Sequence, residues 1–226
     1  AASRLSANTM SLINNYNLYS MDINALDEQS MNLGEAKSYS NRAYIKLKAD
    51  ITKWLSFSPT FQYEYANDRF NQVYDKNSYY VRNRVNGFAG YTADKGFAFN
   101  LPYGNIFYDE NQHTSSYNFR QQFNVDKTFG QKHNLTAILG TEIRNNKLEY
   151  DSGNLYNYDP SVLSYDLVDA KALANVQGAI LGGQYFTAAD IAMQREIVNR
   201  FVSLYSNAGY SYDDKYLATG SIRWDR

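Results

Sequence analysis

The sequence contains no cysteine among its 226 residues, and it has only three prolines and two histidines. Without cysteine, the chain has neither a disulfide framework nor a metal site built on thiolates. Its 22 lysines and arginines nearly balance 23 aspartates and glutamates, which leaves a formal net charge of -1. A nucleic-acid-binding protein needs a basic surface to neutralise phosphates, so this balance argues against a nucleic-acid partner.

Long apolar runs are also missing. No stretch approaches the roughly 18 consecutive apolar residues that mark a transmembrane helix. The opening residues, AASRLSANTM, lack a charged segment followed by an apolar one, so they do not have the pattern of a secretory leader. They also lack an initiator methionine, as expected of a processed chain and of an internal fragment alike.

Residue patterns that would support catalysis or metal binding are scarce. His133 lies in a predicted tight turn, where a solvated polar side chain is the expected role. His113 has Asp109 and Glu110 nearby, which makes a loop metal site conceivable but not the expected arrangement. No nucleophile–base arrangement and no glycine-rich phosphate loop is found. We therefore expect no enzyme activity, no catalytic residue, no cofactor and no metal.

Tyrosine is abundant, with 22 residues beside 12 phenylalanines and two tryptophans. Its apolar ring and polar tip suit a boundary between hydrocarbon and water. A tyrosine-rich soluble β-protein, whose rings fill cross-strand pairs, is the alternative. Composition alone does not separate the two.

A strict alternation of apolar and polar side chains is clearest in LSFSPTFQYEY, residues 55–65. Alternation of this kind predicts β-strands, because successive side chains of a strand point to opposite faces. The same period recurs in five other segments, residues 42–51, 117–129, 134–147, 199–212 and 216–224.

Short polar links join these six segments into three antiparallel hairpins. The links are residues 52–54, 130–133 and 213–215. Two long connections, residues 66–116 and about 148–198, separate the hairpins. Short and long links therefore alternate along the chain.

The long connections give weaker predictions. Residues 79–91 are predicted as a further strand or hairpin arm, and residues 95–104 as a turn-bearing loop. Residues 186–196 are predicted as a short helix, with Thr187 and Asp190 as a capping pair. The first forty residues show no clear period.

Three features favour a membrane over a soluble sheet. The alternating runs are about twice the usual strand length of about 5–6 residues, and they fit the roughly 9–11 residues of a tilted transmembrane strand. Alternating short and long links match periplasmic turns and extracellular loops. Aromatic residues lie near both strand ends, as in interfacial girdles. They are Trp54, Phe129, Tyr212 and Tyr216 near the turns, and Tyr63, Tyr65, Tyr117 and Trp224 opposite.

The predicted fold is therefore all-β, a section of an antiparallel transmembrane β-barrel built from several long hairpins. Because no water can pair a stray backbone group in lipid, only helices and closed barrels cross a membrane. The apolar faces then contact lipid and the polar faces line the lumen. A soluble β-rich binding or adhesion module is the alternative of another class.

Two segments resemble a known family. Residues 40–68, SNRAYIKLKADITKWLSFSPTFQYEYAND, resemble the strand–turn–strand unit of SusC/RagA-type TonB-dependent outer-membrane transporters. Residues 200–226 resemble it more closely, with the turn Tyr212-Asp213-Asp214-Lys215-Tyr216 followed by Ser221, Arg223 and Asp225. The 117–147 hairpin fits less distinctively.

The resemblance implies a barrel of twenty-two strands, a plug domain and a TonB box in the outer membrane of a Gram-negative bacterium. It implies import of oligosaccharides or peptides, driven through TonB and assisted by a SusD-like surface lipoprotein. A siderophore or cobalamin receptor of the same barrel type is the alternative. Neither plug, TonB box nor closing strands are found here, so residues 1–226 are expected to be part of one such barrel domain.

The polar faces supply the candidate site residues. Those expected to line the lumen, by solvating it and packing the plug more than by touching substrate, are Gln62, Glu64, Arg120, Gln122, Glu142, Arg144 and Arg223. Aromatic residues of the long loops would suit stacking on sugar faces, with packing of the loops as the alternative. These are Tyr79, Tyr80, Tyr91, Tyr156 and Tyr158, with Arg82, Arg84, Phe88 and Tyr185 beside them.

Overall fold

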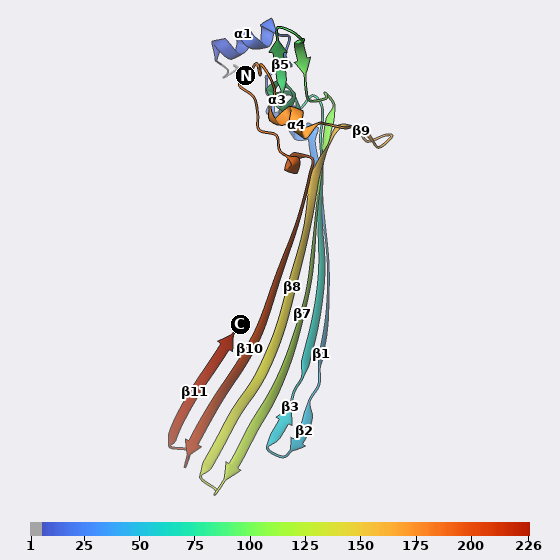
Figure 1. Ribbon diagram of the computed structural model, residues 1–226. Helices are drawn as coiled ribbons and strands as arrows, with labels where there is room; N and C mark the ends of the chain where they lie inside the picture. The colour runs from blue at the N-terminus through green and yellow to red at the C-terminus, as the bar shows by residue number, and fades with distance from the viewer. Residues whose placement is uncertain (1–5) are drawn as a thin grey trace. The chain divides into compact units, whose positions relative to one another are not determined.

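The computed structural model describes residues 6–226, which form two compact units (Figure 1). Unit 1 comprises the described residues up to Lys37, together with Asp68–Gln112 and Tyr150–Arg195. Unit 2 comprises Ser38–Asn67, His113–Glu149 and Glu196–Arg226. Within residues 6–226, no helix has the length and apolar character needed to cross a membrane.

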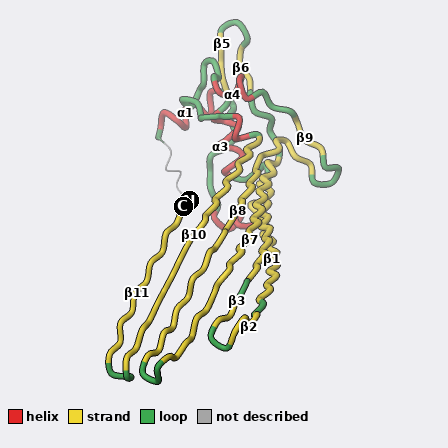
Figure 2. Tube along the Cα trace, turned by 60° about the horizontal axis from the view of Figure 1, so that its bottom comes forward, coloured by secondary structure: helices red, strands yellow, loops and turns green. Residues whose placement is uncertain are grey.

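One sheet has the strand order β1-β4-β7-β8-β10-β11 (Figure 2, yellow). Within the described residues β1 and β11 are its edges, each paired on one side only. The six bounds are β1 (Asn32–Lys46), β4 (Thr60–Tyr74), β7 (Asn105–Phe129), β8 (His133–Asp159), β10 (Ala192–Tyr212) and β11 (Tyr216–Asp225). Short strands β2 (Ala49–Thr52), β3 (Leu55–Phe57) and β9 (Ser164–Asp166) pair onto it, while β5 (Ala89–Thr92) and β6 (Gly96–Phe99) form a separate two-stranded sheet.

All six alternating segments lie in strands, although residues 47–48 and 58–59 interrupt the first two, and their short links are turns of unit 2. The links of β7–β8 and β10–β11 lie side by side, because the Asp213 N–H donates to the Lys132 carbonyl at 2.7 Å. Asp213 and Asp214 have φ values of 52° and 53°, as in the two-residue turn that matches the twist of a hairpin. The predicted hairpins β7–β8 and β10–β11 are therefore confirmed.

The strands are longer than the alternation predicts. β7 has 25 residues, β8 has 27 and β10 has 21. Residues 105–116, 148–159 and 192–198 were expected in loops, and this prediction was wrong. Alternation marks the stretch of a strand with one apolar face, whereas backbone pairing needs only N–H and C=O groups and continues beyond it.

The first hairpin is interrupted where a single strand, residues 55–65, was predicted. β3 ends at Phe57 and β4 begins at Thr60, because Pro59 has no N–H to donate to the ladder. The Pro59 carbonyl still accepts from the Leu47 N–H at 3.0 Å. The break lets β3 pair with β7, with Phe57 opposite Phe123.

The connections of unit 1 form helices that the sequence pattern did not predict. Residues 79–91 were expected as a strand or hairpin arm; residues 79–87 instead form α3 (Tyr79–Gly87), and residues 89–91 do lie in β5, which pairs with β6. The N-cap Ser78 Oγ of α3 accepts from the Val81 N–H at 3.3 Å. The expected loop at 95–104 contains β6. The remaining helices are α1 (Ala7–Asn15), α2 (Ala25–Met31) and α4 (Ala170–Ala174).

The helix predicted over residues 186–196 is reduced to one 3₁₀ turn, η1 (Ala188–Asp190). Its predicted capping pair is present, since the Thr187 N–H and hydroxyl donate to Asp190 Oδ2 at 2.7 and 3.0 Å. From Ala192 onward the chain is strand β10. Residues 192–196, AMQRE, are good helix formers, so the pairing of β10 between β8 and β11 overrides their local preference.

Unit 1 has the core of a water-soluble domain. Val81 and Val85 of α3 and its C-cap residue Phe88 are completely buried and pack with Leu101 and Ile106. Arg84, on the same helix, forms an ion pair with Asp190 and lies 5.3 Å from the Phe88 ring centroid. Helix α3 therefore contributes both apolar contacts and an ion pair to the packing of unit 1.

Candidate functional site

Unit 2 buries polar residues and exposes apolar ones. Every buried hydrophobic residue of the described chain lies in unit 1, whereas the buried residues of unit 2 are Gly140, Glu142 and Ser203. Many large apolar side chains of unit 2 are exposed, with Ile222 at 72 %. Others are Ile45, Leu47, Ile51, Phe61, Phe123, Leu139, Ile143, Leu204 and Trp224.

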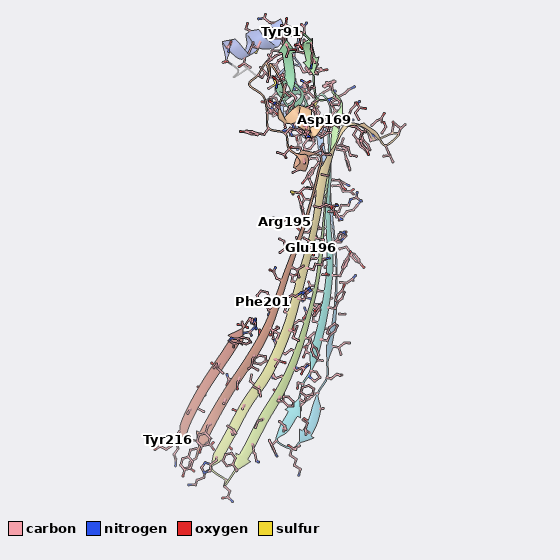
Figure 3. All side chains as sticks on the ribbon, viewed as in Figure 1. Tyr91, Asp169, Arg195, Glu196, Phe201 and Tyr216 are labelled. Carbon is pink, nitrogen blue, oxygen red and sulfur yellow. The ribbon has the colours of Figure 1, made fainter. Side chains whose placement is uncertain are left out.

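The register of β10 and β11 shows that the two kinds of side chain occupy opposite faces. Leu204 is opposite Trp224, and Tyr212 is opposite Tyr216, which Figure 3 labels at the start of β11. At the next position along the two strands, Tyr205 is opposite Arg223. Since directly opposed residues share a face, one face is apolar and the other is polar. We call the latter the polar face of unit 2.

A buried carboxylate organises the polar face. Glu142 on β8 is 2 % exposed, and its Oε1 accepts from Asn118 Nδ2 at 2.7 Å and from Arg144 Nη2 at 3.1 Å. Its Oε2 accepts from Arg120 Nη2 at 3.2 Å, with Arg223 Nη1 4.0 Å away. The three guanidinium groups stay about half exposed, at 47–51 %. Glu142 therefore ties β8 to β7 through charge-assisted hydrogen bonds and to Arg223 of β11 through a longer ion pair.

Arg223 reaches this carboxylate across β10. Its Nε donates to Asp225 Oδ1 at 2.9 Å, and its Nη2 donates to Ser203 Oγ at 3.0 Å. Ser203 is small and buried, so the long arginine side chain passes over β10 without a clash. The small residue on the intervening strand makes this contact possible.

Tyr205 makes a second cross-strand link on the polar face. Its hydroxyl on β10 donates to Gln122 Oε1 on β7 at 2.9 Å. The ring lies over Gly140 of β8, where an added Cβ would overlap ring atoms. The Arg120 guanidinium lies 5.8 Å from the ring centroid. Because Gly140 has no side chain, Tyr205 of β10 can extend across β8 and contact β7.

The predicted lumen residues fall into three groups. The structure brings together Arg120, Gln122, Glu142, Arg144 and Arg223. Glu64 forms a separate two-point pair with Arg42, whose Nε and Nη2 each donate at 3.1 Å. Gln62 lines a pocket on the same face. Asn118, Gly140, Ser203 and Tyr205 were missed, although a glycine on the polar side of an alternating strand is a known signal of close approach.

The pocket has a volume of about 600 Å³ and lies entirely within unit 2. Its cationic lining residues are Lys46, Lys48 and Arg120, and all its other lining residues carry hydroxyl or amide groups. Asn124 Nδ2 donates to Ser58 Oγ at 3.2 Å, so part of this polar lining is held by internal bonds. Cations, hydroxyls and amides can bind a polar ligand, but they supply no nucleophile–base pair.

The loop aromatics lie in unit 1 and mostly pack against its own residues. Tyr156 is buried, its hydroxyl donates to the Asp190 carbonyl at 3.1 Å, and burial raises the pKa of that hydroxyl to about 12. A buried ring cannot stack on a ligand, so Tyr156 is a core residue. Tyr158 stacks on Phe107 and Tyr80 packs on Tyr74, with centroids 4.8 and 4.3 Å apart.

Tyr79 and Tyr91 lie beside the second, smaller core of unit 1. Tyr79 packs against this core, which contains Ile13 and Leu18. Tyr91, labelled in Figure 3, is 49 % exposed, and its ring centroid lies 5.9 Å from that of Tyr16. Of the five predicted loop aromatics, Tyr80 and Tyr91 are therefore the ones with a substantially exposed ring.

The two histidines lie in strands. His113 is in β7, not in a loop as predicted, and its Nδ1 lies 3.1 Å from the Tyr65 hydroxyl. His133 begins β8, and its ring stacks on Phe129 at 5.4 Å. Across residues 6–226, no three histidine, aspartate or glutamate side chains are grouped so as to hold a metal ion.

No protein-family model matches the sequence. The TonB-dependent receptor P39 of Formosa agariphila is 26 % identical over 204 residues, which cover 89 % of this chain and 16 % of that protein. The fold is similar to that of the RagAB peptide transporter, with a TM-score of 0.60 and 14 % identity over 87 % of this chain and 18 % of that one. The open-open and closed-closed RagAB structures give TM-scores of 0.57 and 0.56.

The chain thus spans less than a fifth of the length of these relatives. Its strands are mostly antiparallel, and they do not close into a barrel within the described residues. The predicted resemblance to SusC/RagA-type TonB-dependent transporters is confirmed, because this chain is similar in sequence to a TonB-dependent receptor and has the fold of a section of the RagAB transporter.

Proposed function

We propose that this chain is a section of the wall of a TonB-dependent importer in the outer membrane of a Gram-negative bacterium. The observation that carries the proposal is the inverted character of unit 2, which buries Glu142 and Ser203 while Ile222 and Trp224 are exposed. In water this arrangement is unfavourable, since burial of one large apolar side chain is worth about 1.5–3 kcal/mol. Hydrocarbon against the apolar face removes that penalty.

The strands fit this location. Their alternating stretches, such as residues 117–129 of β7, are long enough for the roughly 9–11 residues of a tilted membrane-crossing strand. Strands β4, β7, β8 and β10 have a paired neighbour on each side, which is the condition for a strand in lipid. The polar face would then line an aqueous lumen, where Glu142 and its arginines are solvated on one side.

The proposed cargo is an oligosaccharide or a peptide, and the chain would act as a pathway rather than as an enzyme. The hydroxyl and amide lining of the pocket suits a ligand rich in hydrogen-bonding groups, and the similar RagAB structures are of a peptide transporter. The proposed partners are TonB, which would supply energy through a plug domain, and a SusD-like surface lipoprotein.

Spin labels test the orientation of unit 2. Nitroxides at Phe61 and Gln62, and in a second pair at Phe123 and Gln122, would be introduced singly into the full-length protein in lipid bilayers. We expect dissolved oxygen to relax the labels at Phe61 and Phe123, and a water-soluble nickel chelate to relax the other two. Equal oxygen relaxation within each pair would refute the proposal, and folding without detergent or lipid would favour a soluble β-rich module.

A further inference from the structure

The pocket on the polar face of unit 2 concentrates charge of one sign. Lys46, Lys48 and Arg120 line it, and none of its lining residues is acidic. The complete chain has 22 cationic and 23 acidic residues, so this lining departs from the average of the sequence. A concave surface lined by cations attracts anions, and its field is screened less than that of a flat surface.

Arg120 is held in place before any ligand arrives. Its Nη2 donates to Glu142 Oε2 at 3.2 Å, and its guanidinium lies 5.8 Å from the Tyr205 ring centroid. Glu142 is itself fixed by Asn118 and Arg144. Because Glu142 is buried and Arg120 is 47 % exposed, the remaining guanidinium edge is available on the surface. A fixed guanidinium loses little entropy when it binds a planar oxyanion.

The lysines complete the cationic lining. Lys48 pairs with Asp50 at 2.9 Å, and both side chains are more than 60 % exposed, so this pair is weak and easily exchanged. For Lys46, no carboxylate of residues 6–226 lies within ion-pair distance of the ammonium group. Its charge is therefore unopposed in the described chain.

Neutral donors surround these cations in a fixed arrangement. Gln122 Nε2 donates to Asn124 Oδ1 at 2.6 Å, which orients the Asn124 amide so that its Nδ2 faces Ser58 Oγ at 3.2 Å. Asn124 Nδ2 also donates to Ser56 Oγ at 3.4 Å, so both amide hydrogens are used. Because the oxygens of Ser56 and Ser58 accept these bonds, their hydroxyl hydrogens remain available toward the pocket. Donors of this kind stabilise an anion once charged groups have attracted it.

We propose that this pocket is an oxyanion site, which holds a carboxylate or sulfate group between Lys46, Lys48 and Arg120. A neutral oligosaccharide needs no such site, whereas the terminal carboxylate of a peptide would fit it, so the inference deepens the proposed function and for a peptide cargo rests on it. The anion has two possible sources, an acidic ligand that diffuses into the pocket or an acidic side chain from another segment of the full-length protein. Both sources present the same oxygen atoms to the same three cations.

Acetylation of lysines provides the test in the full-length protein in detergent. The rate at Lys46 is compared with that at Lys37, which is 70 % exposed and lies outside the pocket. Sodium sulfate replaces chloride at constant ionic strength. We expect sulfate to slow acetylation of Lys46 several-fold and to leave Lys37 unchanged. Arg120→Gln should abolish the protection, whereas Arg42→Gln, a cation on the same face outside the pocket, should retain it.

The second source gives a different result. If an acidic side chain already fills the pocket, Lys46 will react slowly without sulfate, and a carbodiimide will cross-link Lys46 or Lys48 to that residue; this outcome also supports an oxyanion site. Acetylation of Lys46 as fast as Lys37, unaffected by sulfate and without a cross-link, would overturn the inference. The outcome is independent of the spin-label test, which probes lipid contact at Phe61 and Gln62.

Discussion

Replacement of Glu142 by glutamine tests whether a buried carboxylate holds the polar face of unit 2 together. The substitution keeps the shape of the side chain and removes its charge. Asn118, Arg120 and Arg144 then lose a charged acceptor, and the arginines face one another without a counter-charge. The amide can still accept at one oxygen, so the loss is electrostatic rather than steric.

The magnitude follows from the exposure of the partners. Removing one partner of a fully buried ion pair costs about 3–5 kcal/mol. The guanidinium groups here are 47–51 % exposed, so water screens part of the loss. Hydrogen bonds to charged groups are worth about 1.5–3 kcal/mol each, and one of them survives in weakened form. We expect Glu142→Gln to lower the free energy of unfolding by about 2 kcal/mol. This loss is larger than the loss expected when an exposed ion pair is removed.

The assay is denaturant unfolding of the full-length protein in detergent, followed by far-ultraviolet circular dichroism. The matched control is Glu64→Gln, because Glu64 also binds an arginine at two points but its side chain is 31 % exposed. An exposed pair is worth at most about 1 kcal/mol. If Glu142→Gln costs no more than Glu64→Gln, the reasoning from burial is refuted.

The double variant Glu142→Gln/Arg144→Gln separates loss of attraction from new repulsion. If repulsion between arginines contributes, removal of Arg144 should recover part of the lost stability in the Glu142→Gln background. In the wild-type background Arg144→Gln should instead be destabilising. If Arg144→Gln stabilises one background and destabilises the other, the difference between the two effects is the coupling energy between Glu142 and Arg144. Identical effects in both backgrounds would show that Arg144 does not act through Glu142.

Three further predictions concern single sites. Gly140→Ala should cost about 1–3 kcal/mol because its Cβ overlaps the Tyr205 ring, and the cost should vanish in a Tyr205→Ala background, as measured by the same unfolding assay. The raised pKa of Tyr156 predicts that its stabilising contribution is complete below pH 10 and is lost as the pH rises from about 10 to about 12, so Tyr156→Phe should flatten this part of the stability curve. Arg84→Met should leave Asp190 without its partner and speed limited proteolysis of unit 1, whereas an unchanged rate would show that the pair is dispensable.

The strand segments could be predicted because a strand with one face toward hydrocarbon needs apolar side chains at alternate positions. In residues 117–129 the alternate positions are apolar or aromatic except for Gln121 and Lys127, and this constraint is visible in the sequence. Residues 105–116 have no such constraint, so their continuation of β7 depends on backbone pairing, which leaves no side-chain pattern. The interruption at Pro59 had a visible cause, since proline cannot donate to a ladder, but the alternation concealed it.

Helix α3 could not be predicted from apolar periodicity alone. Val81, Val85 and Phe88 have helical spacing, but the intervening arginines and asparagines and the neighbouring aromatic residues resemble a loop or a strand. Ser78 was a usable signal, because serine before such a run is a common N-cap. Tertiary burial of three apolar residues then outweighs the weak local preference.

The membership of the polar cluster was predicted, but its convergence was not. The alternation within each strand assigned four charged residues to the polar face: Arg120, Glu142, Arg144 and Arg223. That they meet depends on the register between strands and on the order β7-β8-β10-β11, which no short pattern encodes. Ser203 shows the limit most clearly, because its role depends on an arginine from the next strand.

The two edges of the sheet have a consequence for anyone who produces this segment by itself. β1 and β11 each present a row of N–H and C=O groups with no neighbour in the described chain. Water can satisfy those groups, but acyl chains cannot, at a cost of several kcal/mol for each group. In a bilayer the isolated segment should therefore pair its edge strands with other proteins or with copies of itself. A series of oligomers on a native gel would then reflect unpaired edge strands and not a natural assembly.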